Sequence, residues 1–404
     1  MFGPCRSRLT MTLAAATLGL IAVQSAAADQ LLVLEKDTQT LAIIDPTTLQ
    51  VMARAPAGTD PHEVVASDDG ARAYISNYGG EGSALHILSI VDLGTHQALP
   101  AIDLGALHSA HGLDFVAGKV YFTAESSKAI GSYDPAQARI DWVMGTGQDR
   151  THMIWVARDL KHIYTTDVRS GTVSILESSM RRAFGPPPQP MVTIWDVTHV
   201  VSGRGAEGFD LSPDGRQLWA ANSQDGTVTV IDLASKKASE TFPIPVHGAN
   251  RLKFTLDGRY VLISALGVFG STQPQPDHNN LVVLDAASHK LVKAFDLGGG
   301  AAGILIAPNG ARAFIAVSGA DKVAVIDLKT MSVSAQIAPL HQPDGMAWAR
   351  TAAADPRGTD EQGATARCRD GTYVHGTVLP SVCSGHGGVE KWLRGPPQEL
   401  IGRN

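Results

Sequence analysis

Short apolar segments alternate with polar turns along most of the chain, and many of the turns contain Asp-Gly or Asn-Gly. The pattern appears in DGARAYISN (69–77), DGRQLWAAN (214–222), DGRYVLISA (257–265) and NGARAFIAVSG (309–319). The segments are rich in Val, Ile and aromatic residues, which is typical of strands, and the Gly pairs indicate tight hairpins. No helical periodicity competes over a long stretch, so we expect an all-β fold.

These strands form units of four, named A to D here. In the first complete unit, A is EVVAS (63–67), B is RAYIS (72–76), C is LHILSIVDL (85–93) and D is QALPAIDLG (97–105). Four-stranded units of roughly 40–50 residues are typical of β-propeller blades. The units start 41 to 55 residues apart, at His62, His111, His152, Glu207, Asn250, Gly303 and Asp344.

The two ends of the repeat region complete each other. Residues 31–56 provide strands B, C and D without an A strand, and DGMAWAR (344–350) provides an A strand with nothing after it. Together they make one blade from both ends, which hides the edges that an open array would expose. The sequence therefore predicts a seven-bladed propeller over residues 29–350.

Several repeats carry a recognisable motif: YISN (74–77), WAAN (219–222) and VIDL (230–233 and 325–328). With PHE, AHG, THM, AEG and PDGMA at the unit starts, they resemble the exported bacterial YVTN-repeat propellers, which are YncE-like and cytochrome d1-like. The resemblance covers roughly residues 30–350 and implies the fold. Such propellers serve varied roles, so it implies no single activity.

The chain begins with features of a secretory signal peptide, residues 1–28. CRSR (5–8) is basic, LTMTLAAATLGLIAV (9–23) is apolar and SAAA (25–28) suits cleavage. We therefore expect a periplasmic or secreted protein without a transmembrane anchor. Loss of Arg6 and Arg8 would take the formal net charge from −6 to −8. An acidic protein is not expected to bind nucleic acid, and we expect a monomer.

The last part of the chain differs from the repeats. Residues 351–366 read as a polar linker, and residues 367–404 resemble a small bacterial domain of uncharacterised function with two cysteines and a His-Gly-Gly motif. We expect a disulfide between Cys368 and Cys383, because exported compartments are oxidising and small domains need a covalent staple. Free thiols or a shared metal are the alternatives. His386 reads as a turn residue rather than a metal ligand.

The unit starts suggest a metal site. Strand A is the innermost strand of a blade, so its first residues converge at the channel mouth. His62, His111, His152 and Glu207 lie on consecutive blades and have the composition of a site for Zn, Cu, Fe or Mn, with Glu207 also a candidate base. The alternative is a set of histidines that bind only water and carbonyl groups. Asn250 and Asp344 would be second-shell or rim groups.

Two insertions interrupt the repeats. Residues 266–280, between strands B and C of blade 6, would lie on the same face as the unit starts and could cover the mouth with Phe269 and His278. Residues 178–190, with Arg181 and Arg182, lie between strands C and D of blade 4. They would emerge on the opposite face, as a stiff spacer or a partner-docking loop.

Two function classes remain open. The first is a non-enzymatic binding propeller of the cell envelope, which would hold a protein or small-molecule ligand. The second is a metal-dependent enzyme of lactonase, lyase or oxidase type that acts at the channel mouth. A haem d1-type propeller is disfavoured, because those have eight blades. The chain lacks C-x-x-C-H, G-x-S-x-G, Walker, Rossmann and H-E-x-x-H motifs.

Overall fold

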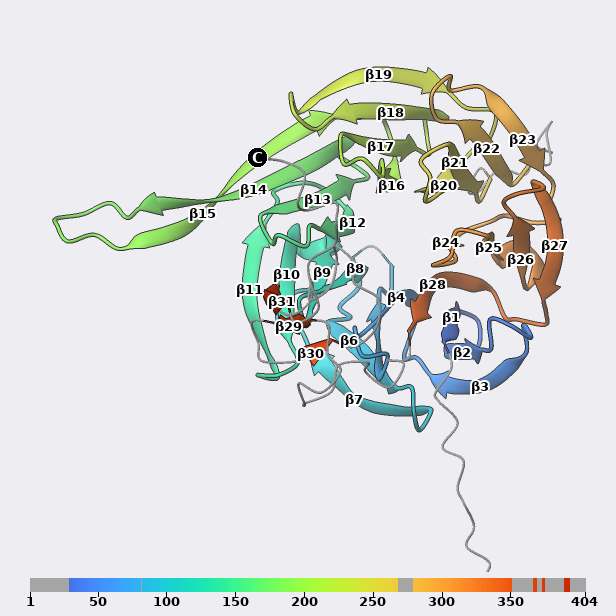
Figure 1. Cartoon of the computed structure of the whole chain (residues 1–404), viewed down its shortest axis with the longest axis horizontal. Coiled ribbons are helices and arrows are strands. Elements are labelled where there is room, and N and C mark those ends of the chain that lie inside the picture. The colour runs from blue at the N-terminus through green and yellow to red at the C-terminus, as the bar shows by residue number, and fades with distance from the viewer. Residues whose placement is uncertain are drawn as a thin grey trace, which may run out of the picture.

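Each of the seven repeat units folds into a four-stranded antiparallel sheet, and the sheets are arranged around a central axis (Figure 1). The computed structural model describes residues 29–80, 82–267 and 279–350, and three short strands between residues 366 and 392. The all-β, seven-bladed prediction is confirmed. In order from the innermost strand outward, blades 1 to 4 contain β28 (Pro343–Ala349), β1 (Gln30–Glu35), β2 (Thr40–Ile44) and β3 (Val51–Pro56); β4 (Pro61–Ala66), β5 (Arg72–Asn77), β6 (Ile87–Asp92) and β7 (Gln97–Asp103); β8 (Ala110–Val116), β9 (Lys119–Ala124), β10 (Ala129–Asp134) and β11 (Arg139–Gly145); β12 (Thr151–Val156), β13 (His162–Asp167), β14 (Thr172–Arg182) and β15 (Met191–Val201). Blades 5 to 7 contain β16 (Ala206–Leu211), β17 (Gln217–Asn222), β18 (Thr227–Asp232) and β19 (Lys237–Pro243); β20 (Ala249–Phe254), β21 (Tyr260–Ala265), β22 (Leu281–Asp285) and β23 (Leu291–Phe295); β24 (Ile304–Ile306), β25 (Arg312–Val317), β26 (Lys322–Asp327) and β27 (Ser332–Ile337).

Burial decreases from the middle of each blade to its outer edge. In blade 2, strands β5 and β6 are buried over most of their length. Both of their faces are covered, so they read as apolar runs such as LSIV rather than as strict alternation. The outermost strand β19, KASETFP, is exposed at nearly every position. Its charges discourage the pairing of this open edge with another chain.

The predicted closure of the ring is confirmed. Strand β28, from the end of the repeat region, pairs antiparallel with β1, and Leu32 lies opposite Ala347. The indole Nε1 of Trp348 also donates a hydrogen bond to Oδ2 of Asp29 at 2.8 Å. The seven innermost strands then contact one another in succession around the axis. The first residues of these strands are therefore held at one end of the channel.

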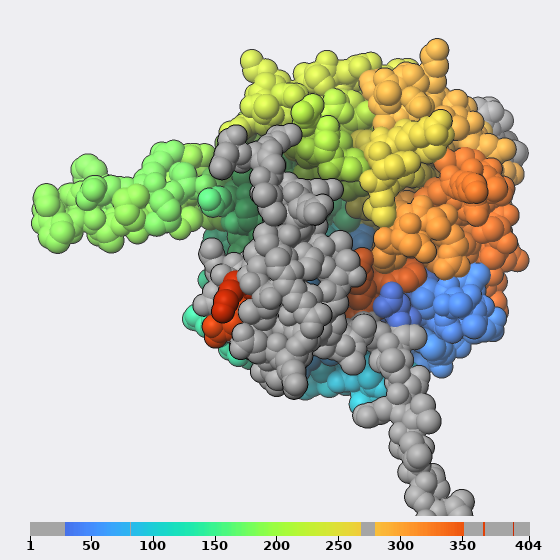
Figure 2. Space-filling view, viewed as in Figure 1, coloured from blue at the N-terminus to red at the C-terminus, as the bar shows by residue number. Residues whose placement is uncertain are grey.

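The insertion in blade 4 is a strand extension rather than a loop. Strands β14 and β15 stay paired in register from Thr172 opposite Val201 to Arg182 opposite Met191. They are the third and fourth strands of their blade, as predicted, and form an arm that projects clear of the other blades (Figures 1 and 2). The side chain of Phe184, near its tip, is fully exposed.

Several predictions fall outside the described residues. These are the signal peptide (1–28), Phe269 and His278 of the blade-6 insertion, and Cys383 and His386. The disulfide between Cys368 and Cys383 therefore stays a prediction. In the C-terminal region, β29 (Ala366–Cys368) pairs with β30 (Tyr373–Val374) and β31 (Val389–Trp392). The helices of the described residues are two 3-10 turns, η1 (Glu125–Ser127) and η2 (Ser318–Ala320), neither of which could cross a membrane.

Candidate metal centre in the channel mouth

A cavity of about 540 Å³ lies in the channel mouth. One residue of each innermost strand or its lead-in lines it, and we call this residue the ring position. The ring positions are His62, His111, His152, Glu207, Asn250, Ala302 and Asp344. Six of them are the predicted unit starts. In blade 7 the ring position is Ala302, so the prediction of Gly303 is wrong by one residue.

A β-bulge sets this register. In blade 3, Ala110 pairs with Ala124 and Leu113 pairs with Phe122, so that His111 and Gly112 together face one residue, Thr123. The ring residue is the first of the two bulged residues, and the bulge turns its side chain into the channel. In blade 7 the glycine fills the second place: a Cβ on Gly303 would lie 2.3 Å from the carbonyl oxygen of Asp344. A Cβ on Gly112 would meet that of His152 at 2.4 Å.

Hydroxyl groups of the second strand fasten neighbouring ring residues together. The Thr123 hydroxyl accepts from the Gly112 N–H and donates to the carbonyl oxygen of His152, both at 2.8 Å. Thr166 likewise donates to the carbonyl oxygen of Glu207. The ring backbones are thus tied from blade to blade, which positions their side chains closely.

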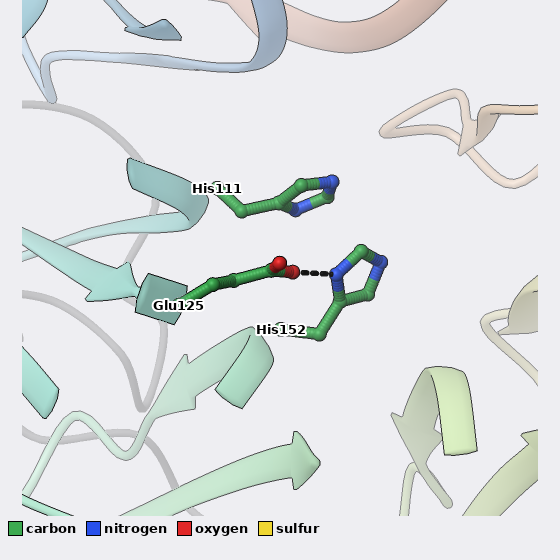
Figure 3. A group of neighbouring side chains, drawn as sticks. All are labelled: His111, Glu125 and His152. Carbon is green, nitrogen blue, oxygen red and sulfur yellow. Dashed lines mark hydrogen bonds and ion pairs between the residues drawn. The ribbon is translucent and has the colours of Figure 1, made fainter. Parts of the chain in front are cut away.

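The side chains of His111, Glu125 and His152 converge in this mouth (Figure 3). All three are buried, and each offers a ligand atom within 4.8 Å of the others. The imidazole rings of His111 and His152 lie 3.7 Å apart between centroids. Nδ1 of His152 contacts Oε1 of Glu125 closely. This buried His-Glu-His group could hold a metal ion.

Glu125 is fixed in place by three donors. The Tyr78 hydroxyl donates to Oε2 at 2.6 Å, the Arg150 Nε donates to the same oxygen at 3.3 Å, and His152 contacts the other oxygen. Burial alone would raise the pKa of Glu125, but His152, Arg150 and Tyr78 outweigh it and lower the pKa. The group is therefore a carboxylate at neutral pH, as a metal ligand must be.

The two histidines differ in charge. Burial, together with His152, His62 and two arginines, holds the pKa of His111 well below its usual range. Its imidazole is therefore neutral, and its Nδ1 is buried without a hydrogen-bond partner among the described residues. Burial also disfavours charge on His152, but Glu207 and Glu125 outweigh it and raise its pKa. A proton on His152 thus occupies a place between carboxylates that a cation would favour.

Glu207 lies on the other side of His152. Its Oε2 is 2.8 Å from Nε2 of His152, although without the alignment of a hydrogen bond. Burial opposes its charge, but His152, Arg150 and Arg251 lower the pKa of Glu207 to about 2. Glu207 can therefore orient His152 from outside the group of three, in the way that second partners orient ligating imidazoles.

His62 is engaged elsewhere. The ammonium of Lys36 lies 2.8 Å from its Nε2, and also 3.3 Å from Asp60 and 3.5 Å from Asp344. A ring nitrogen that accepts from an ammonium cannot offer the same lone pair to a metal ion. The structure thus brings the four predicted ligands to one cavity, but within reach of one ion it brings His111 and His152 together with Glu125.

Sequence reasoning missed Glu125, although a signal existed. It is the first residue after the second strand of its blade, and the same position in other blades also faces the cavity. Lys36, Tyr78, Leu266 and Ser318 are these cavity-lining equivalents. These turn residues form a second circle beside the ring positions, with the same repeat phase.

The charges around the mouth do not balance. Five carboxylates face three permanent cations, which leaves a formal charge of −2 before the histidines are counted. The carboxylates are Asp60, Glu63, Glu125, Glu207 and Asp344; the cations are Lys36, Arg150 and Arg251. Like charges in a partly buried site repel strongly, so a divalent cation would relieve the excess.

Comparisons with known proteins identify the fold and one terminal region. Residues 361–393 match a family described as a domain of unknown function, DUF3761. No curated protein matches the chain. Among solved structures, a functionally unknown protein from Desulfotomaculum acetoxidans is 13% identical, with a TM-score of 0.61 over 80% of this chain and 99% of that one.

Two other solved structures have known activities of their own. Dihydro-haem d1 dehydrogenase NirN is 14% identical, with a TM-score of 0.54 over 78% of this chain and 74% of that one. Hydrazine synthase from Kuenenia stuttgartiensis is 19% identical, with a TM-score of 0.52 over 67% and 77%. At these identities the likeness shows the propeller fold alone. The predicted resemblance to cytochrome d1-like propellers is thus confirmed at the level of fold.

Proposed function

We propose that this protein is an exported propeller of the cell envelope that binds a transition metal ion in its channel mouth and holds a small ligand beside it. His111, Glu125 and His152 would hold the ion, and Glu207 would orient His152. Two imidazoles and a carboxylate suit Zn, Cu, Fe or Mn better than Ca or Mg, which prefer all-oxygen sites. Export rests on the predicted signal peptide, residues 1–28.

One observation carries this proposal: Nδ1 of His111 is buried, neutral and unpartnered beside a carboxylate and a second imidazole. A buried polar atom without a partner costs about 1–3 kcal/mol, and propellers can fill a channel with apolar residues at no such cost. A metal ion would satisfy Nδ1, replace the proton on His152 and offset the formal charge of −2.

A catalytic role is the second candidate. Structural zinc sites have four protein ligands, whereas catalytic sites have three and keep a position for water or substrate. The three ligands here adjoin a cavity of about 540 Å³ on the side of Asn250 and Ala302. A bound metal ion would supply Lewis acidity there, and Glu207 would hold or release a proton through His152.

Metal analysis of the protein purified without added metal tests the site. We expect about one ion per chain in wild type. His111→Ala and Glu125→Gln should lose more than the roughly 10- to 100-fold in affinity typical of removing an outer partner of a ligand. Trace metal in wild type, with no uptake of Zn²⁺ or Co²⁺ on reconstitution, would contradict the proposal.

His62→Ala separates the two ligand sets. If His111, Glu125 and His152 are the ligands, this variant keeps its metal, because His62 is bound to Lys36. If the four unit-start residues are the ligands, His62→Ala loses the ion and Glu125→Gln keeps it. Hydrolysis of dihydrocoumarin, a simple lactone, by the zinc-loaded protein then distinguishes catalysis from binding.

A further inference from the structure

The residue two positions before each ring residue, here called the lead position, has a left-handed backbone in six of the seven blades. Its φ lies between 44° and 76° at Asp60, Ser109, Arg150, Gly205, Gly248 and Gln342. Glycine adopts this conformation freely, whereas other residues are strained by roughly 1–2 kcal/mol. Blades 5 and 6 use glycine, so the fold itself does not require a side chain there.

Arg150 is the long cationic exception to this pattern. It lines the cavity, and its side chain is 26% exposed. Its Nε donates to Glu125, while neither terminal nitrogen forms a hydrogen bond or ion pair among the described residues. A guanidinium has five N–H donors, and the four on the terminal nitrogens remain available. Strain accepted at a site that glycine could fill points to a use for this side chain.

A second guanidinium lies across the same mouth. Arg251 lines the cavity and is held by Glu63 and by the Asn250 side-chain oxygen, the latter at 3.2 Å. Both arginines act electrostatically on His111 and on Glu207. The candidate metal group is therefore within reach of two fixed cations.

The carboxylates around the mouth are already occupied. Asp60 and Asp344 contact Lys36, and Glu63 contacts Arg251. Glu125 and Glu207 flank His152. The groups left to a ligand are thus N–H donors and an open position on the ion. This arrangement recognises negative charge, because charge-assisted bonds from a guanidinium to an oxyanion are strong and can be bidentate.

We propose that the cavity binds a small molecule through an oxyanion, a carboxylate or a phosphate, with one oxygen on the metal ion and the others on the terminal nitrogens of Arg150. This inference rests on the proposed metal site. Arg150 is a binding residue of the channel, and Arg251 provides a second positive wall. The rest of the ligand occupies the cavity toward Asn250 and Ala302.

The test uses the full-length protein loaded with Co²⁺, whose visible spectrum reports changes in coordination. Acetate and inorganic phosphate are the probes, and acetamide is the uncharged counterpart of acetate. We expect wild type to bind one or both anions and not acetamide. Whichever anion binds more tightly identifies the oxyanion. Equal binding of acetate and acetamide would overturn the proposal.

Arg150→Gly is the decisive variant, because glycine fits the left-handed backbone of residue 150 as it does at 205 and 248. The variant should fold and keep its cobalt, since Glu125 retains Tyr78 and His152. Anion affinity should fall about 10- to 100-fold, the loss typical of a charge-assisted pair of bonds. Arg150→Lys, which keeps the charge without the planar fork, should recover part of it.

Gln342→Gly is the matched control, because it makes the same backbone change at an uncharged lead position of blade 1. Its anion affinity should stay within about twofold of wild type. Arg150→Gly that keeps both cobalt and full anion affinity would overturn this inference and leave the metal site standing. Wild type that takes up no cobalt would instead refute the proposed function.

Discussion

Single buried residues carry much of the electrostatic strain of this propeller. Asp167, at the end of β13, is completely buried. It accepts hydrogen bonds from the hydroxyl groups of Ser174 at 2.6 Å and Thr172 at 3.1 Å. Burial nevertheless outweighs these bonds and raises the pKa of Asp167 to about 6. At neutral pH the folded protein therefore holds a charge that water would solvate better.

This residue makes stability depend on pH. Since the pKa of Asp167 is higher in the folded than in the unfolded chain, its protonated form favours folding. That contribution is complete below about pH 4 and is lost as the pH rises to about 6, an upper bound of roughly 3 kcal/mol. Asp167→Asn should remove this part of the slope in urea unfolding measured from pH 4 to 7. Parallel curves for the two proteins would contradict the assignment.

At the scale of the strand, each blade places three side chains in the mouth: the lead position, the ring position and the first residue after the second strand. The sequence predicts the ring positions, because apolar runs and turns mark the start of each innermost strand. It does not reveal the bulge, which is why Gly303 was taken in place of Ala302. Glu125 was missed because only one circle of equivalent positions was considered.

The contacts of long side chains could not be predicted in the same way. Lys36 reaches His62 from a turn 26 residues earlier in the sequence, and nothing in the repeat phase indicates that contact. His62 and His111 look equivalent in sequence, yet one meets an ammonium and the other meets Glu125 across the group of three. Repeat phase therefore predicts which residues share a cavity, whereas the turns decide which of them share an ion.

The hydroxyl of Thr123 is expected to be essential to this arrangement. Thr123→Val keeps the shape but leaves the Gly112 N–H and the His152 carbonyl oxygen without that partner. At about 1–3 kcal/mol for each group, the free energy of unfolding should fall by roughly 2–4 kcal/mol. Metal affinity should also fall, because His152 loses its anchor. Thr48→Val, in an exposed turn, is the control and should change neither quantity in denaturant unfolding and metal titration.

At the scale of the whole molecule, the two ends of the repeat region depend on each other. Strand β28 covers the inner edge of β1, and Ala347 and Ala349 belong to the same buried cluster as Leu32 and Leu34. The same strand begins at the mouth, where Asp344 contacts Lys36. Closure of the ring and assembly of the cavity are therefore one event, which links the stability of the fold to its candidate function.

Two truncations test this link. Ending the chain after residue 350 keeps all seven blades, so we expect the same unfolding midpoint and the same metal affinity as the full chain. Ending it after residue 342 removes β28, exposes the paired edge of β1 and leaves Lys36 without Asp344. This second protein should lose most of the roughly 5–15 kcal/mol that stabilises a folded domain, and should aggregate through its open edge. Thermal unfolding and light scattering of the two proteins, side by side, measure both effects. If the shorter protein unfolded cooperatively at the midpoint of the longer one, closure would not be what holds the ring together, and the mouth would have to be assembled by contacts between neighbouring blades alone.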